Sequence, residues 1–240
     1  VKTKYSAISI GESVCGILNL RECASILHDD TINSDLCTGE SIALEDLRRH
    51  RILGKGKFGE VWLVTNSKAT KTEPYALKNQ SHYDEETDAE GRIRKEISIM
   101  RELQQQFIVK LINTYEEKES ISMLLSLAPG GELFDQIHFQ LPNGLWDSGM
   151  GEKKGLFYFS IIADALSFMH VRGYIYRDLK PENILIGVDG YPLITDFGFT
   201  RHLEANEKAY TLCGTPNYLV RVLGQTVLVI IIRYSPLDMT

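Results

Sequence analysis

The chain has 240 residues, of which 43% are hydrophobic and 24% are charged, and its formal net charge is −6. These values are ordinary for a globular protein of one or two domains, and they argue against a nucleic-acid surface or a polybasic membrane surface. The longest apolar run, residues 227–232, is too short to cross a bilayer. The four cysteines show no C-x-x-C spacing, which favours a cytoplasmic location.

The chain begins with two segments of different character. Residues 1–27 alternate small and apolar side chains and end in a short helical pattern. Residues 28–46 are polar and are predicted to form a linker.

Between residues 47 and 219, strand patterns come first and helical patterns follow. Strands are predicted around the glycine-rich stretch at 54–59 and at 61–64 and 75–78. The spacing of apolar residues predicts a helix at 92–103 and a longer, largely buried helix around 159–169, with Phe159 among its apolar positions. This order indicates an α+β protein with two lobes, whereas residues 220–240 fit no pattern well.

The glycine-rich stretch reads G-K-G-K-F-G-E-V from residue 54 to residue 61. Glycines at these positions allow a strand-turn-strand to bring backbone N–H groups close to phosphate. A dinucleotide site would place such a motif between a strand and a helix, whereas a second strand follows here. On this motif alone, a phosphate-binding loop and a tight structural turn remain about equally good interpretations.

Lys78 ends the strand at 75–78, and Glu96 lies on the helix that follows. Considered singly, such a lysine is usually a solvated edge residue and such a glutamate belongs to a charged helix face. As an ion pair, the two would hold the ammonium group against nucleotide phosphates.

The most informative run is Y-R-D-L-K-P-E-N at residues 176–183. Asp178 is the candidate base that accepts a hydroxyl proton, and Asn183 is a candidate Mg²⁺ ligand. Lys180 would neutralise charge on the transferred phosphoryl group. Asp196, which opens Asp-Phe-Gly, is the second candidate metal ligand. A lone Asp-Phe-Gly is common, but its position behind the other motifs makes a chance match improbable.

In these motifs the chain resembles eukaryotic protein kinases of the AGC group, most closely the cGMP-dependent and cAMP-dependent kinases. The match is carried by residues 107–111, 128–134, 176–183 (with Tyr176 in place of the usual His) and 211–216. The resemblance implies a two-lobed kinase fold over residues 47–219, with a complete N-lobe and an incomplete, mostly helical C-lobe. It also implies ATP and Mg²⁺ as cofactors.

The resemblance assigns roles to further residues. It implies a hinge from Leu125 to Leu127 behind a gatekeeper-like Leu124. The catalytic positions are Asp178, Lys180, Lys78 and Glu96, and the metal ligands are Asn183 and Asp196. The nucleotide-binding positions are Gly54, Lys55, Gly56, Gly59, Val61, Ala76, Lys78, Leu125, Leu127, Glu132 and Leu185. For the apolar positions, core packing is the alternative interpretation. A regulatory spine would stack Tyr176, Phe197, Met100 and Leu111.

Regulatory and substrate positions follow in the same way. Thr211 resembles an activation-loop phosphorylation site whose phosphate would pair with Arg177 and Arg201. Thr215, together with Lys180, implies Ser/Thr specificity. Glu132 and Glu182 match acidic positions that receive ribose or a basic side chain, so the expected partners are proteins with basic residues upstream of the target Ser or Thr.

Both ends of the chain depart from this pattern. Residues 1–27 resemble the last part of a cyclic-nucleotide-binding domain, but the phosphate-binding arginine is replaced near Tyr5. We therefore expect cyclic nucleotide to act on the parent protein and not on this chain. A nondescript β-rich extension is the alternative interpretation of residues 1–27.

After Leu219 the family's Ala-Pro-Glu does not follow, and residues 220–240 are predicted to be a non-homologous tail. We accordingly expect the longer helix to present an apolar face to water. Two functions remain open: a protein Ser/Thr kinase, or a catalytically incompetent kinase fragment that acts as a nucleotide-binding or interaction module.

Overall fold

The structure is a computed structural model that describes residues 42–56, 59–70, 73–81, 88–141 and 144–204. The predictions for residues 1–27, for most of the linker and for residues 220–240 lie outside the described residues.

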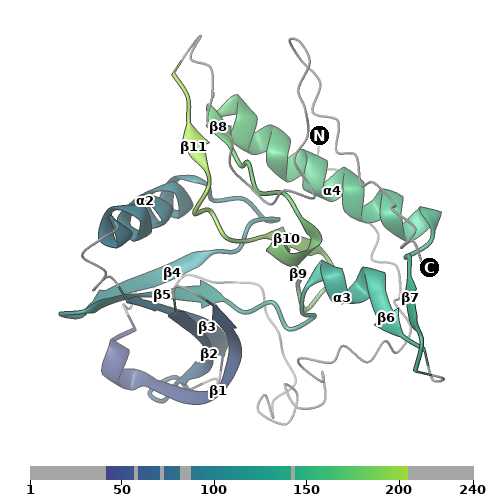
Figure 1. Cartoon of the computed structure of the whole chain (residues 1–240). Coiled ribbons are helices and arrows are strands. Elements are labelled where there is room, and N and C mark those ends of the chain that lie inside the picture. The colour runs from purple at the N-terminus through teal and green to yellow at the C-terminus, as the bar shows by residue number, and fades with distance from the viewer. Residues whose placement is uncertain (1–41, 57–58, 71–72, 82–87, 142–143, 205–240) are drawn as a thin grey trace.

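A five-stranded antiparallel sheet forms one lobe (Figure 1). Its order is β1-β2-β3-β5-β4, and a short 3-10 helix at Leu44–Asp46 precedes it. The strands are β1 (Leu47–Gly56), β2 (Gly59–Asn66), β3 (Pro74–Ser81), β4 (Leu111–Glu116) and β5 (Ser120–Ser126). The strand assignments made from the sequence are therefore confirmed for β1 to β3.

Helix α2 (Ala89–Glu102) lies beside this sheet. It begins at the N-cap Asp88, whose carboxylate accepts a hydrogen bond from the Gly91 amide, which satisfies a free N–H of the first turn. Its buried face carries Ile93, Glu96, Ile97 and Met100, at the spacing of one side of a helix. The helix prediction is confirmed, with a start three residues earlier than expected.

The other lobe is mostly helical, and in Figure 1 it lies above and to the right of the sheet. Its helices are α3 (Leu133–Ile137) and the 20-residue α4 (Glu152–Val171). Short segments between α4 and the sheet carry the catalytic motifs: β8 (Tyr174–Ile175), a 3-10 turn (Pro181–Asn183), β9 (Ile184–Ile186), β10 (Pro192–Ile194) and β11 (Arg201–His202). A further hairpin joins β6 (His138–Gln140) to β7 (Trp146–Ser148). None of the described helices has both the length and the apolar character needed to span a bilayer.

This arrangement confirms the predicted α+β, two-lobed kinase-like fold. The sheet lobe is complete, and the described residues contain part of a helical lobe. Phe159 and Leu156 are 46% and 60% exposed, so Phe159 is not buried as predicted, whereas the expectation that the longer helix presents an apolar face to water is confirmed. Both side chains lie on the side of α4 opposite its buried residues Ile161, Ala165 and Met169, so α4 presents apolar groups to water.

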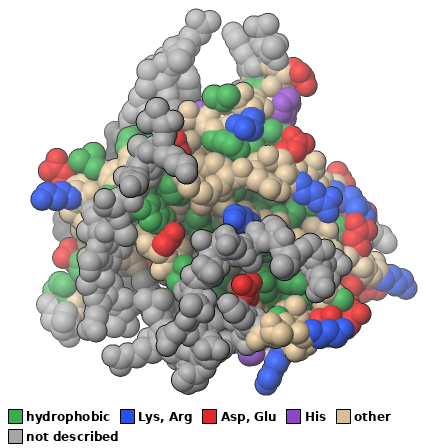
Figure 2. All heavy atoms as spheres, turned by 180° about the vertical axis from the view of Figure 1, so that it is seen from behind, with side chains coloured by type: hydrophobic (Ala, Val, Ile, Leu, Met, Phe, Trp, Pro, Cys, Tyr) green, Lys and Arg blue, Asp and Glu red, His purple; other side chains and the backbone are tan. Residues whose placement is uncertain are grey.

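The main hydrophobic core joins the two lobes. It contains side chains from the inner face of the sheet, from α2, from α4 and from the segments that carry the catalytic motifs. A second, smaller cluster of Val64, Leu77 and Leu124 lies on the opposite face of the sheet. The surface shown in Figure 2 has Lys and Arg side chains interspersed with Asp and Glu side chains.

Candidate active site

The glycine-rich hairpin is formed by β1 and β2, which pair with Gly54 opposite Val61 and Gly56 opposite Gly59. A Cβ atom added at Gly54 or Gly56 would meet no atom within 4 Å, so the backbone there faces open space. Gly59 is different. It has a φ of +148°, and a Cβ there would lie 1.9 Å from the carbonyl oxygen of Asn79 on β3. Gly59 is therefore required by strand packing, whereas Gly54 and Gly56 leave room for a ligand.

This difference leads to a prediction about the fold. We expect Gly59→Ala to destabilise the protein by about 2 kcal/mol or more, because alanine rarely adopts this φ and its methyl group would collide with β3. Gly54→Ala, a matched change on the facing strand, should cost less than about 1 kcal/mol. Urea unfolding of both variants measures the difference, and equal losses would contradict the packing argument.

Lys78 lies in the middle of the sheet, where β3 pairs with β2 at Val61 and with β5 at Met123. Its Nζ atom is 2.8 Å from Oε1 of Glu96 on α2 and 4.0 Å from Oδ1 of Asp196. Burial by itself would lower the pKa of Lys78, but the carboxylates of Glu96 and Asp196 outweigh burial and raise it. Lys78 is therefore a cation at neutral pH, and the structure brings these three predicted residues together.

The catalytic run folds so that Asp178 is held from two sides. Its Oδ2 atom accepts hydrogen bonds from Asn183 Nδ2 at 2.8 Å and from Lys180 Nζ at 2.9 Å. The same Asn183 nitrogen also donates to the Asp178 backbone carbonyl. Asp178 is 3% exposed, so these donors fix a buried carboxylate in one orientation.

The backbone connects this loop to Asp196. The amide of Thr195, which precedes Asp196, donates to the Asn183 carbonyl at 3.1 Å. Arg177 and Asp196, at φ values of 70° and 58°, are the non-glycine residues with positive φ in the described part of the chain. Such conformations cost about 1–3 kcal/mol and persist where surrounding contacts enforce them. Here the positive φ values set the directions of the Arg177 and Asp196 side chains, which lie before and after Asp178 and Asn183 in the chain.

The apolar positions that the sequence predicts to bind nucleotide belong to the main core or pack against it. Ala76 and Leu125 are opposite one another in the β3–β5 register and are 9% and 7% exposed. Val61, Leu127 and Leu185 are partly buried against the same cluster. Leu53 is packed there too. Leu53 was not among the predicted positions, although strand alternation directly before Gly54 could have indicated it.

The gatekeeper prediction was wrong by one residue. Leu124 pairs with Leu77 and belongs to the small cluster on the opposite face of the sheet. Leu125 therefore lies on the face of Ala76 and the main core instead, because successive side chains of a strand point to opposite faces.

The four predicted spine residues lie in one cluster. Tyr176 and Phe197 pack edge to face with ring centroids 5.7 Å apart, Met100 is buried with them, and Leu111 is partly buried against the same cluster. The Tyr176 hydroxyl donates to the Thr195 carbonyl next to Asp196. Tyrosine at this position thus ties the catalytic run to the Asp-Phe-Gly segment.

Glu132 and Glu182 form an acidic region in which their charges act on one another. The pKa of Glu132 is raised, first by burial and then by the neighbouring carboxylates of Asp135 and Glu182, with a partial opposing effect from Lys180. Glu182 Oε2 is buried, with no hydrogen-bond partner among the described residues. A cationic group placed there would relieve both unfavourable interactions.

The predicted regulatory residues are described in part. The β8–β11 pairing places Arg201 opposite Ile175, two residues before Arg177. Arg177 Nε donates to the Phe199 carbonyl at 2.7 Å, which anchors its side chain. Thr211 and Thr215 lie outside the described residues.

The donor set fits a divalent cation held jointly with phosphates. Both hydrogen bonds of the Asn183 side chain use Nδ2, so its carbonyl oxygen can accept a cation, and the Asp196 side chain is 46% exposed. Within the described ranges, no group of three His, Cys, Asp or Glu side chains is placed to hold a metal ion. Mg²⁺ sites of this type use one or two protein ligands, with phosphate oxygens and water supplying the rest.

Comparison with known proteins shows what the chain resembles. The protein kinase domain family matches residues 47–222. Isozyme 2 of the cGMP-dependent protein kinase of Drosophila melanogaster is 39% identical over 180 residues, which are 74% of this chain and 18% of that protein. The cGMP-dependent protein kinase of Eimeria tenella is 37% identical over 179 residues (74% and 17%).

A third relative is the cAMP-dependent protein kinase catalytic subunit PRKX of Homo sapiens. It is 36% identical over 178 residues, which are 74% of this chain and 47% of that protein. The chain thus spans less than a fifth of the two cGMP-dependent relatives and about half of PRKX.

Proposed function

The chain belongs to the protein kinase family, and we propose that it transfers the γ-phosphoryl group of ATP to serine or threonine hydroxyls of proteins. The observation that carries this proposal is the contact of Lys78 with both Glu96 and Asp196, next to a catalytic loop that holds Asp178 in place. The relatives named above are cGMP-dependent and cAMP-dependent protein kinases, which supports protein kinase activity here.

Each residue has a physical task in this mechanism. Lys78, held by Glu96, binds and orients the phosphates of the nucleotide. The Asp178 carboxylate accepts the proton of the substrate hydroxyl as the new oxygen–phosphorus bond forms and the bond to ADP breaks. The Lys180 ammonium, 2.9 Å from Asp178, neutralises charge on the phosphoryl group. Asn183 and Asp196 would hold Mg²⁺, which supplies charge neutralisation at the phosphate oxygens.

The direct test is phosphate transfer to a basic peptide, combined with thermal unfolding in the presence and absence of Mg-ATP. We expect transfer and an unfolding temperature that rises with Mg-ATP, because a ligand that binds the folded state stabilises it. A rise in the unfolding temperature without phosphate transfer would instead support the alternative of a nucleotide-binding or interaction module. The exposed Leu156 and Phe159 side chains on α4 also favour this alternative. Neither effect would contradict both functions.

We further propose that substrates carry Arg or Lys upstream of the target hydroxyl. The support is the acidic region of Glu132 and Glu182, where one carboxylate has a raised pKa and the other has a buried oxygen without a partner. A guanidinium group would supply the missing donors and the missing charge. We also propose a cytoplasmic location, from the cysteine usage of the sequence.

Glu132→Gln tests this acidic region through pH. The pKa of Glu132 is higher in the folded state, so its contribution to stability is complete below the unfolded pKa and is lost as pH rises through the folded pKa. We expect the variant to be more stable than the parent at about pH 7 but not at about pH 4. Thermal unfolding at both pH values measures this.

The same variant should raise the KM for a basic peptide by about tenfold or more, since a charged hydrogen bond contributes about 1.5–3 kcal/mol. A peptide that lacks upstream basic residues is the control and should show little change. Equal changes for the two peptides would contradict the substrate proposal.

A further inference from the structure

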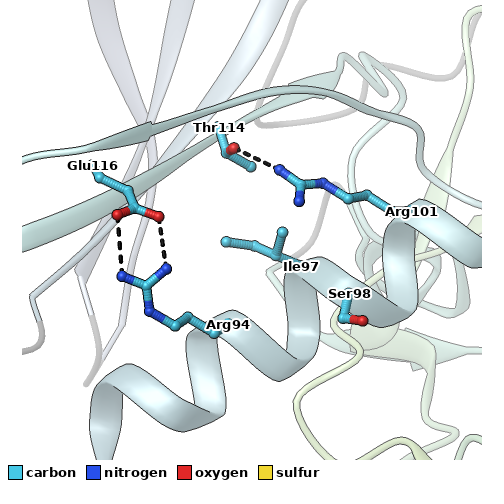
Figure 3. Close-up of a pocket in the computed structure, with 6 residues that line it drawn as sticks. All are labelled: Arg94, Ile97, Ser98, Arg101, Thr114 and Glu116. Carbon is cyan, nitrogen blue, oxygen red and sulfur yellow. Dashed lines mark hydrogen bonds and ion pairs between the residues drawn. The ribbon is translucent and has the colours of Figure 1, made fainter.

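Helix α2 presents two arginines to the edge strand β4 (Figure 3). Arg94 and Arg101 are seven residues apart and therefore lie on one side of the helix, two turns from each other. Thr114 and Glu116 are two residues apart on β4 and therefore share a face of the strand. Arg94 Nη1 and Nη2 donate to the two Glu116 oxygens at 2.7 and 3.0 Å, and Arg101 Nη2 donates to Thr114 Oγ1 at 2.9 Å.

The Arg94 guanidinium makes three hydrogen bonds to two carboxylates. Besides the two bonds to Glu116, its Nε donates to Glu90 Oε1 at 2.8 Å, one turn earlier on the same helix. Ile97, which is 7% exposed, fills the space between the two arginines. A planar group fixed by a bidentate carboxylate and a second carboxylate has one preferred orientation. The contact therefore sets the position of α2 along β4 as well as attaching it.

The location of this contact connects it to the active site. Arg94 is two residues before Glu96, so the two side chains point to different sides of α2. Glu96 points toward Lys78 on β3, whereas Arg94 points across to β4. Since the β strands form one sheet, fixing α2 against β4 fixes the place from which Glu96 reaches Lys78.

We propose that Arg94 and Glu116 are positioning residues, which form an ionic clamp that keeps Glu96 within hydrogen-bond distance of Lys78. The proposal concerns residues outside the predicted nucleotide-binding positions and outside the catalytic loop. Its consequence for phosphate transfer rests on the proposed function, but its consequence for the Lys78–Glu96 pair does not.

The exposure of the clamp determines the size and the signature of its effect. The Arg94 and Glu116 side chains are 49% and 59% exposed, and the pocket lined by these residues has a volume of about 180 Å³, so water and salt ions reach the charges. Exposed ion pairs are weak and are screened by salt. We therefore expect loss of the clamp to change the chemical reactivity of the Lys78 amine by a few-fold, and we expect this change to depend on the salt concentration.

The experiment compares Glu116→Lys, Arg94→Glu and the double charge-swap variant with the parent chain. The control is Lys95→Glu, which reverses the charge of an exposed residue on the same helix. The first readout is the rate at which Lys78 is reductively methylated without nucleotide, followed by mass spectrometry. When Glu96 moves away, the Lys78 amine loses the carboxylate that contacts it at 2.8 Å and becomes more accessible to the reagent.

We expect each single variant to raise Lys78 labelling about two- to fivefold at low salt, and we expect about 1 M salt to shift the parent in the same direction. The double variant should recover part of the change, with Glu90 opposing full recovery. Lys95→Glu should match the parent. The second readout, the KM for ATP of the active protein, should rise while kcat changes less.

The outcomes separate the two proposals. Unchanged labelling in both single variants, or an equal change in Lys95→Glu, would overturn the clamp whatever the activity of the chain. Absent recovery in the double variant would also overturn it, because a general loss of structure is not repaired by exchanging charges. Absence of transfer in the parent, with labelling as expected, would overturn only the proposed function.

Discussion

Asp178→Asn is expected to lower the rate of phosphate transfer by about 10²–10⁴-fold, the usual contribution of a positioned general base. The amide has nearly the same shape but cannot accept the substrate proton. It also weakens the charged hydrogen bonds that Asn183 and Lys180 make to this side chain. The measurement is kcat with a basic peptide at saturating Mg-ATP.

The affinity for nucleotide distinguishes catalysis from folding in this experiment. The carboxylate of Asp178 is held by Asn183 and Lys180 of its own loop, so we expect the Kd for a fluorescent ATP analogue to change less than about threefold. Asp164→Asn, a matched change at an exposed residue of α4, should retain the parental rate. If the Asp178→Asn variant retains the parental rate of transfer, Asp178 is not the general base.

Lys78→Met is expected to lower both activity and stability. Transfer should fall by about 10²-fold or more, as found when one electrostatic donor to a transition state is removed. The change also leaves Glu96, which is 5% exposed, as a buried carboxylate without its main partner. Breaking a buried pair costs about 3–5 kcal/mol. Because the Lys78 side chain is 22% exposed, we expect about 2–3 kcal/mol in urea unfolding.

A second substitution separates the two effects. Lys78→Met combined with Glu96→Gln removes the unpaired charge, so most of the lost stability should return while transfer stays low. Lys118→Met, at an exposed lysine, is the control for loss of a positive charge. If the double variant is no more stable than Lys78→Met, the buried Glu96 charge is not the source of the destabilisation.

Much of the arrangement of the candidate site could be predicted, because residue types and short spacings determine which chemical groups lie together. The run at 176–183 contains the base, the lysine and the amide within six residues, from Asp178 to Asn183, and a single loop brings them together. Lys78 and Glu96 are 18 residues apart, yet each lies on an element with clear periodicity, so their pairing could also be expected. The two-lobed fold followed from the order of strands and helices.

Three features could not be assigned from the sequence. The residue of β5 that lies on the same face as Ala76 was predicted one position too early, since Leu124 and Leu125 are both apolar and only the pairing with β3 shows which one lies opposite Ala76. The separate role of Gly59 depends on how closely Asn79 approaches it. The contact of Arg94 with Glu116 joins residues that lie in different elements and belong to no motif.

The sequence by itself determined the family, the order of elements and the identity of the chemical groups, because residue type and local spacing carry that information. The tertiary structure decided which face each strand turns to the main core, which glycine is needed for packing and what holds α2 in place. The physical reason is that strand pairing fixes the phase of an alternating pattern, and a shift of one residue moves every side chain to the other face. Contacts between separate elements likewise exist only after the chain has folded.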